Sequence, residues 1–150
     1  MGKEIERKFL IQGKIPLELG EPTLIKQGYI FAEKGKHLRI RIVKNAAILG
    51  LKYTEGLVRD EFEYNIPFEE GMEMYKKCEM KVEKIRFSVK HEGFFYDLDF
   101  FPNNIRYMEV EFPTKEDSTA FIKPEWLGKE ITGESEYSNI TLSKQKLSFN

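Results

Sequence analysis

Apolar and polar residues alternate with a period of two along most of the chain. Such alternation is typical of β-strands with one apolar face, and Gly, Asn and Pro residues separate the runs. The pattern predicts eight strands, at residues 3–11, 24–31, 37–44, 47–54, 59–66, 83–91, 94–101 and 106–113. Several connections are short, which indicates antiparallel hairpins between neighbours.

A helical pattern appears in three other segments. Apolar residues at helical spacing predict an amphipathic helix from Glu69 to Met80. A sequence resembling a capping box predicts a short helix over 114–122. We expect an irregular stretch at 124–129 and a further helix at about 136–144. No linker or repeat divides the chain, so we expect one domain over residues 1–150.

Seven of the eight predicted strands have one apolar face and one charged face. The charged faces hold Glu4, Glu6 and Lys8; Arg39 and Arg41; Lys52 with Thr54; Glu61 and Glu63; Lys84 and Arg86; Asp97 and Asp99; Glu109 and Glu111. Like charges two positions apart on one face repel and need counter-ions. Divalent cations would neutralise the carboxylate pairs, and a polyanion would neutralise the basic pairs. A solvated outer face remains the alternative for any single strand.

Closing eight antiparallel strands gives a barrel wide enough to hold one small ligand. With the charged faces inside, the barrel becomes an ionic tunnel. The apolar faces then point outward and need a cover. The predicted helices and the C-terminal residues supply one, and a second copy of the chain in a homodimer is an alternative that the pattern leaves open. We therefore expect an α+β fold, a closed eight-stranded antiparallel barrel wrapped by a few helices.

The charge balance narrows the function. The chain has 24 Lys+Arg against 25 Asp+Glu, a formal net charge of -1, which argues against a generic nucleic-acid binder or a membrane-surface protein. No apolar stretch is long enough to span a membrane, and the sequence opens with charged residues, so we expect a cytoplasmic protein. One cysteine excludes an internal disulfide, and two histidines cannot form a zinc site alone. We therefore expect a hard, oxygen-bound metal and direct attack by water.

Several motifs occur in a fixed order: Glu4-Ile5-Glu6-Arg7-Lys8, Gln27-Gly28-Tyr29, Arg39-x-Arg41, Lys52-x-Thr54, Glu61-x-Glu63, Lys84-x-Arg86, Asp99-x-Phe101, Glu109-x-Glu111, 126–132 and Tyr137-Ser138-Asn139. In this ordered set the sequence resembles the CYTH superfamily, also called triphosphate tunnel metalloenzymes. Glu-x-Glu-x-Lys near the N-terminus is the most specific of these motifs. The resemblance implies an antiparallel tunnel that binds triphosphate substrates with Mg²⁺ or Mn²⁺, as one ion or two.

The resemblance also implies a role for each charged residue. The metal carboxylates would be Glu4, Glu6, Glu63, Asp99, Glu109 and Glu111. The phosphate ligands would be Lys8, Arg39, Arg41, Lys52, Lys84 and Arg86. Direct roles in catalysis fall to Lys8, Glu4, Glu6 and Glu63. Glu61 and Asp97 match less well and are expected only to balance charge.

Two residues beside these motifs are treated separately. His37 shares the face of Arg39 and Arg41; we expect it at the tunnel rim, and the alternative is a contact to a terminal phosphate with a role in proton transfer. Arg7 lies on the apolar side of its strand, so we leave it outside the site.

The expected activity is metal-dependent hydrolysis of a triphosphate, foremost inorganic tripolyphosphate, to pyrophosphate and phosphate by water attack on a terminal phosphoryl group. Three alternatives stay open. One is an adenylate cyclase, in which a ribose hydroxyl replaces water. Another is a hydrolase of nucleoside or thiamine triphosphate. The third is a module that binds polyphosphate without turnover, although its many carboxylates would then have little use.

Overall fold

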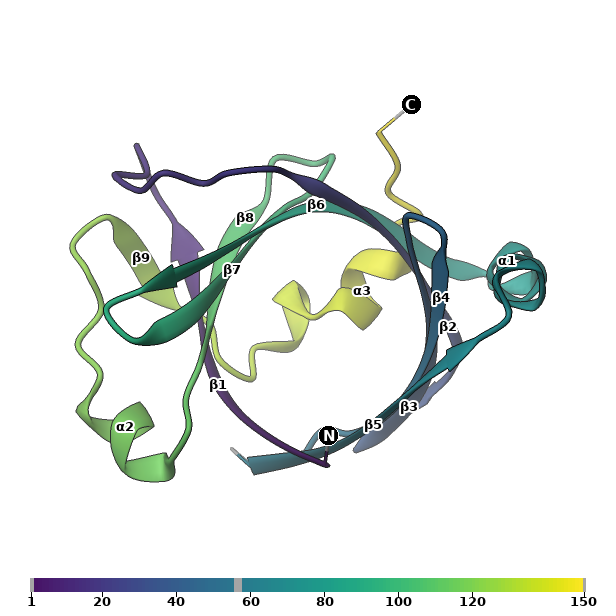
Figure 1. Cartoon of the computed structure of the whole chain (residues 1–150), viewed down its shortest axis with the longest axis horizontal. Coiled ribbons are helices and arrows are strands. Elements are labelled where there is room, and N and C mark those ends of the chain that lie inside the picture. Colours follow the sequence, from purple (N-terminus) through teal and green to yellow (C-terminus); the bar gives the residue numbers. More distant parts are fainter. Residues whose placement is uncertain (1, 56–57, 150) are drawn as a thin grey trace.

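The computed structural model describes residues 2–55 and 58–149. Within these residues, eight strands form the predicted closed antiparallel barrel, seen end-on in Figure 1. They are β1 (Gly2–Ile11), β2 (Thr23–Glu33), β3 (Lys36–Val43), β4 (Ala46–Tyr53), β5 (Val58–Ile66), β6 (Met80–His91), β7 (Phe94–Phe100) and β8 (Arg106–Glu111). The order β5-β4-β3-β2-β6-β7-β8-β1 closes where β1 pairs with β5. The eight predicted strands are confirmed, with ends shifted by a few residues.

Strand β1 pairs with three other strands. One edge pairs with β8 over residues 6–10, while the other edge pairs with β5 over residues 2–5. Beyond β5, that second edge pairs with β9 (Leu127–Glu130). The irregular stretch predicted at 124–129 is therefore wrong in part. A strand of four residues carries too little alternation to be recognised, and its pairing depends on a partner far away in the sequence.

Helix α1 (Phe68–Lys77) covers the outer face of the barrel beside β3 and β4. It ends earlier than the predicted Met80, because Cys78 is already extended and Met80 begins β6. The apolar side of α1 packs on Ile40, Ile42 and Ala47. None of the described helices is long and apolar enough to cross a membrane.

Helix α2 (Lys115–Ala120) covers another part of the outer wall and begins, as predicted, at a Thr114 cap that accepts from the amide of Asp117. Phe121 follows it and packs against the apolar cluster of Phe9 and Phe112 on the outside of β1 and β8. The apolar faces of the strands thus point outward, as the alternation predicted, and helices cover part of them.

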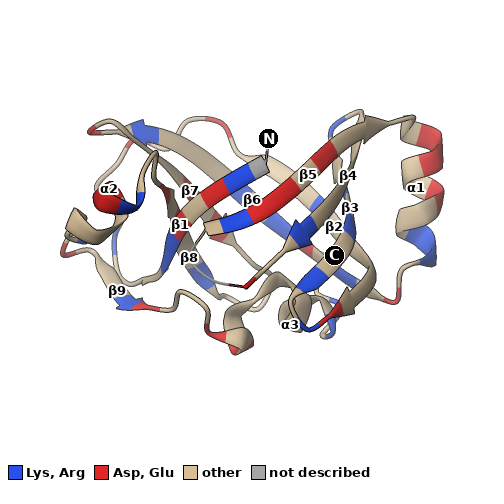
Figure 2. Ribbon diagram, turned by 90° about the horizontal axis from the view of Figure 1, so that it is seen from below, with Lys and Arg blue, Asp and Glu red and all other residues tan. Residues whose placement is uncertain are grey.

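The C-terminal segment closes one end of the barrel. A 3-10 turn, η1 (Ser135–Tyr137), leads into α3 (Asn139–Ser143), and both lie across the ring in Figure 1 and along one rim in Figure 2. The helix predicted at 136–144 is therefore split, because Ser138 is extended and caps α3 through its hydroxyl. Leu142 packs against Val82 and Tyr107 of the barrel.

Candidate active site

The charged faces of the strands meet inside the barrel. A cavity of about 240 Å³ is lined by Glu4, Glu6, Arg39, Arg41, Lys52, Glu61, Glu63, Lys84, Arg86, Asp97, Glu109, Glu111 and Asn139. An adjoining pocket of about 280 Å³ adds Lys8 and reaches the C-terminal segment. Of the predicted site residues only Asp99 lines neither space. The alternation therefore identified the wall of the tunnel correctly.

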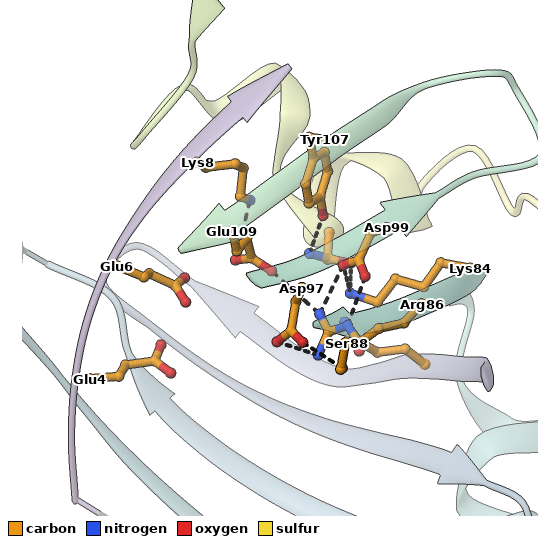
Figure 3. A network of polar contacts seen from close by, with 12 residues as sticks. Glu4, Glu6, Lys8, Lys84, Arg86, Ser88, Asp97, Asp99, Tyr107 and Glu109 are labelled. Carbon is orange, nitrogen blue, oxygen red and sulfur yellow. Dashed lines mark hydrogen bonds and ion pairs between the residues drawn. The ribbon is translucent and has the colours of Figure 1, made fainter. Parts of the chain in front are cut away.

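Asp99 lies within the wall, where two cations hold it (Figure 3). Arg86 donates from Nε to Oδ1 at 2.7 Å and from Nη2 to Oδ2 at 2.8 Å, and Nζ of Lys84 lies 2.9 Å from Oδ2. Burial alone would raise the pKa of Asp99, but Arg86 and Lys84 outweigh it and lower the pKa to about 2. Asp99 is thus an anion engaged by protein cations, and its contacts suit the orientation of Arg86 better than the binding of a metal.

Lys84 connects the tunnel to the C-terminal segment. Its side chain is 1% exposed and donates from Nζ to Oδ1 of Asn139 at 3.0 Å. Asn139 in turn donates from Nδ2 to the hydroxyl of Tyr107 at 3.0 Å. Burial, only partly offset by Asp99, lowers the pKa of Lys84 to about 7. Asn139 was not among the predicted site residues, because no local sequence pattern shows that α3 reaches into the barrel.

Four carboxylates from β1 and β8 gather next to β7 in the barrel wall. Glu6 lies directly across from Glu111 in the strand register, and Glu109 lies two positions away on the same face of β8. Burial raises the pKa of Glu6 well above its ordinary value, and the neighbouring Glu109 and Glu4 raise it further. Burial and then Glu4 also raise the pKa of Glu111. Glu109 differs, because Lys8, Arg86 and Lys84 outweigh its burial and hold its pKa well below the ordinary value, and Arg86 donates from Nη2 to its Oε1 at 3.3 Å. Glu4, Glu6 and Glu111 repel this anion and one another when ionised, and a hard divalent cation would relieve that repulsion.

The donor set of this acidic cluster, defined as Glu4, Glu6, Glu109 and Glu111, fits Mg²⁺ or Mn²⁺ because all its ligand atoms are carboxylate oxygens. Among the described residues no three Asp, Glu, His or Cys side chains already enclose a metal position. Figure 3 shows Glu4 and Glu6 pointing from β1 toward the interior. The fit to the metal thus rests on the carboxylate donors and on their position inside the barrel.

Lys52 and Arg39 organise the other acidic residues. Lys52 forms two ion pairs: its Nζ lies 2.5 Å from Oε1 of Glu4 and 3.8 Å from Oε2 of Glu61. Nη2 of Arg39 donates to Glu61 at 2.9 Å and to Glu63 at 3.1 Å. Glu63 is 42% exposed, whereas Glu61 is 18% exposed. Glu61 is therefore the more central of the two, and Glu63 steadies Arg39 near an opening.

The positive charge of Arg41 has little negative charge beside it. It donates from Nε to Oε1 of Gln27 at 2.9 Å, and within the described part of the chain it forms no ion pair. Burial, with Arg39 and Arg86 nearby, lowers its pKa to about 10. A buried guanidinium with so little negative charge beside it favours an anionic ligand in the cavity.

Arg59 also belongs to the site, although the sequence analysis did not include it. It lines the 280 Å³ pocket, and its Nη1 lies 3.7 Å from Oε1 of Glu6. The signal was present, because Arg59 precedes Glu61 by two positions on one strand and so shares its face.

Comparison with known proteins agrees with this architecture. An inorganic triphosphatase from Acetivibrio thermocellus is 38% identical over 148 residues, which cover 96% of this chain and 95% of that protein. An inorganic triphosphatase from Nitrosomonas europaea is 34% identical over 146 residues, or 93% of this chain and 96% of that protein. No family model matches the chain.

Solved structures give the same result. The crystal structure of an inorganic triphosphatase has a TM-score of 0.70 at 31% identity, covering 96% of both chains. A protein from Pyrococcus furiosus, at 22% identity and a TM-score of 0.62 over 78% of this chain and 83% of that one, shows a shared fold. On its near full-length relatives and its charged tunnel, the chain belongs to the family of these inorganic triphosphatases, within the CYTH superfamily of triphosphate tunnel metalloenzymes.

Proposed function

We propose that this protein hydrolyses triphosphates, and inorganic tripolyphosphate in particular, to pyrophosphate and phosphate. The observation that carries the proposal is the division of one cavity by strand order: its basic lining residues, the basic wall, come from β4, β3 and β6, and its acidic ones from β5, β1, β8 and β7, which follow one another around the barrel. The relatives described as inorganic triphosphatases support the choice of substrate.

The basic wall would bind the phosphate chain. Arg39 is held by Glu61 and Glu63, so its guanidinium has a fixed direction before substrate arrives. Guanidinium groups present a fork of N–H donors that matches phosphate oxygens, and Arg41 offers such a fork with little competing negative charge. Lys8 and Lys52 add point charges from the adjoining strands. Since phosphoryl transfer needs mainly positioning and charge neutralisation, these groups supply most of what the reaction requires.

The acidic cluster would hold Mg²⁺ or Mn²⁺. When bound, such an ion neutralises phosphate oxygens and lowers the pKa of a coordinated water. Glu63 and Asp99 were also expected to bind metal, but their contacts with Arg39 and Arg86 favour an orienting role in this proposal.

In the hydrolysis itself, a water oxygen forms a bond to a terminal phosphorus while the bridging P–O bond to the next phosphate breaks. The bridging oxygen leaves with pyrophosphate, and the water gives up a proton. Direct attack is supported because the only cysteine, Cys78, lies on the outer wall under α1. The tunnel side chains thus hold the substrate and the charge, and none forms a covalent intermediate.

Two accompanying expectations stay predictions. We expect a cytoplasmic location, because disulfides are typical of proteins in oxidising compartments and a chain with one cysteine cannot form an internal disulfide. A homodimer would use the outer wall, where Leu24, Ile30 and Tyr64 remain exposed.

The test is product analysis. The purified protein is incubated with tripolyphosphate, ATP or thiamine triphosphate, each with Mg²⁺ or Mn²⁺, and the products are resolved by ion chromatography. We expect equal amounts of pyrophosphate and phosphate from tripolyphosphate, and no turnover in EDTA. Cyclic AMP with pyrophosphate from ATP would show a cyclase instead, and tight binding without products would show a phosphate receptor.

A further inference from the structure

His37 is a buried histidine that the proposed chemistry does not yet use. Its side chain is 6% exposed, in contrast to the position at the rim expected from the sequence. Neither Nδ1 nor Nε2 has a hydrogen-bond partner within the described residues. Leaving a buried polar group unpaired costs about 1–3 kcal/mol, and native proteins seldom do so without a ligand, water or function at the site.

The imidazole borders the 280 Å³ pocket next to the catalytic cavity. It projects from β3 opposite Lys52 of β4, and its ring meets that of Tyr29 edge-on at 5.1 Å. Across the pocket lie Ser135 and Ser138 of the C-terminal segment. The pocket therefore lies between the barrel wall and the segment that closes this end of the tunnel, and it shares Arg39 and Lys52 with the neighbouring cavity.

The charges around His37 determine what it can bind. Burial, followed by the charges of Arg39, Lys52, Arg59 and Arg41, lowers the pKa of His37 to about 3. At neutral pH the ring is therefore uncharged and offers one N–H donor and one nitrogen acceptor. Because the nearest charged groups are cations, an anionic occupant is favoured over a neutral one such as a sugar.

An unesterified terminal phosphate matches both functions of the ring. It has more free oxygens than an internal phosphate, and a group of this kind keeps a proton that titrates near pH 6. The N–H of His37 can donate to one oxygen while the other nitrogen accepts from the phosphate O–H. The α-phosphate of a nucleoside triphosphate carries an ester bond as well as an anhydride bond, so it has no such hydroxyl and satisfies only half of the pair; in a nucleotide only the γ-phosphate, at the other end of the chain, keeps one.

We propose that His37 is a specificity-determining residue, which hydrogen-bonds an end phosphate of tripolyphosphate in the pocket between β3 and the C-terminal segment, at the position that the esterified α-phosphate of a nucleotide would take. The inference rests on the proposed function and deepens it. It explains how an enzyme of this architecture would favour an inorganic chain over a nucleoside triphosphate. A competing occupant of the same pocket is the ribose of a nucleotide.

The experiment compares His37→Phe, which keeps a ring of similar size without polar atoms, with His37→Asn and His37→Gln, which keep a donor and an acceptor. KM and kcat are measured for tripolyphosphate and ATP. We expect His37→Phe to raise KM for tripolyphosphate about tenfold, the equivalent of one hydrogen bond, with a much smaller change for ATP. At least one amide variant should restore most of the preference.

His91→Phe is the matched control, because it changes the only other histidine, which is partly exposed at the end of β6. It should leave both substrates unaffected. Equal losses for tripolyphosphate and ATP in His37→Phe, no loss for either, or a selective loss for ATP would each overturn the proposal. If His37→Phe does not fold, as judged by thermal unfolding, His37→Ala provides the same comparison.

Calorimetric binding in EDTA separates this inference from the proposed function. If the wild-type protein fails to hydrolyse tripolyphosphate, the proposed activity is wrong. A selective loss of tripolyphosphate binding in His37→Phe would nevertheless support recognition of the chain end. Equal binding of tripolyphosphate by wild type and variant would overturn the inference even if the enzyme turns over normally.

Discussion

Arg7 and Glu130 form a two-point ion pair on the outside of the barrel, with Nε donating to Oε2 at 2.9 Å and Nη2 donating to Oε1 at 2.8 Å. The same guanidinium donates from Nη1 to the carbonyl oxygens of Ser118 and Phe121, at the end of α2. One side chain thus ties β1, β9 and α2 together. Arg7 follows the predicted metal ligands Glu4 and Glu6 and precedes the predicted phosphate ligand Lys8 in the sequence, yet its side chain binds on the outer wall.

Replacing Arg7 should affect stability and leave catalysis intact. Arg7→Lys keeps the charge but cannot make the forked contact, so the free energy of unfolding should fall by about 1–3 kcal/mol. Urea unfolding measures this change, and KM and kcat for tripolyphosphate should remain those of the wild type. Lys3→Ala is the control, since Lys3 and Asp60 form an exposed pair whose loss should cost less than about 1 kcal/mol. A large fall in kcat for Arg7→Lys would contradict the outer-wall role.

Glu6→Gln should separate metal binding from stability. Burial and the neighbouring carboxylates hold the pKa of Glu6 above its ordinary value, so the ionised form weakens the metal-free fold increasingly as pH rises through the folded pKa. The neutral amide removes that effect. In EDTA at pH 8 the variant should therefore melt at the wild-type temperature or higher.

With added Mg²⁺, the wild type should gain thermal stability through binding, whereas Glu6→Gln should gain little and hydrolyse no tripolyphosphate. Glu79→Gln, an exposed position outside the tunnel, should behave as wild type throughout. An undiminished Mg²⁺ shift in Glu6→Gln would show that the acidic cluster is not the metal site.

The sequence predicted what depends on alternation and missed what depends on register. Period two placed Glu4, Glu6 and Lys8 inside and Arg7 outside, because adjacent residues on a strand face opposite sides. It could not pair Arg86 with Asp99, since that contact is set by the alignment of β6 with β7. Alternation predicts whether a side chain faces the inside or the outside of the barrel, but not how far it lies from the ends of the tunnel.

For this reason His37 was expected at the rim although it is buried. The same limit applies to β9 and α3. Leu127–Glu130 has hydrogen-bond partners only because β1 leaves part of an edge free beyond β5. Asn139 reaches Lys84 only because the C-terminal segment folds back into the barrel. Neither relationship is encoded in a local pattern.

Asn139→Leu should loosen the C-terminal segment. The variant loses the acceptor for Lys84 and the donor to Tyr107, and it leaves a buried ammonium with one partner fewer. We expect a loss of about 1–3 kcal/mol in the free energy of unfolding. Hydrogen exchange should show faster exchange of the α3 amides, while those of α1 on the outer wall change little. Gln145→Ala, at an exposed position after α3, is the control. If the α3 amides of Asn139→Leu exchange as slowly as those of the wild type, the segment is held by apolar packing alone.

His37 should make the protein sensitive to acid. Its pKa is lowered from 6.5 to about 3 by burial and then by its cationic neighbours, so the unfolded chain binds the proton more readily than the folded one. Stability should therefore fall as pH drops from about 6.5 toward 3, by up to about 1.4 kcal/mol per pH unit. The groups facing the ring are Tyr29, Arg39, Arg41, Lys52 and Arg59.

The measurement is the difference in unfolding free energy between wild type and His37→Asn, taken in EDTA from pH 7.5 to 4. The difference should move in favour of the variant as pH falls. Asp99, lowered from 3.8 to about 2, loses its contribution only in more acidic solution, so the two effects occupy different pH ranges. A difference that stays constant with pH would show that the ring is protonated as easily in the folded protein as in the unfolded one.

The three-way pairing of β1 has a consequence for how the protein is made. Its partners lie at residues 58–61, 107–111 and 127–130, so the strand that carries Glu4, Glu6 and Lys8 is made before any of its neighbours. Contacts between distant parts of a chain form slowly, because a long loop must close before they are rewarded. While the ribosome is still adding residues 106–130, β1 has no edge of β8 or β9 to join. Glu109 and Glu111 can therefore join Glu4 and Glu6 only after β8 has been made, so the acidic cluster cannot form on the first half of the chain.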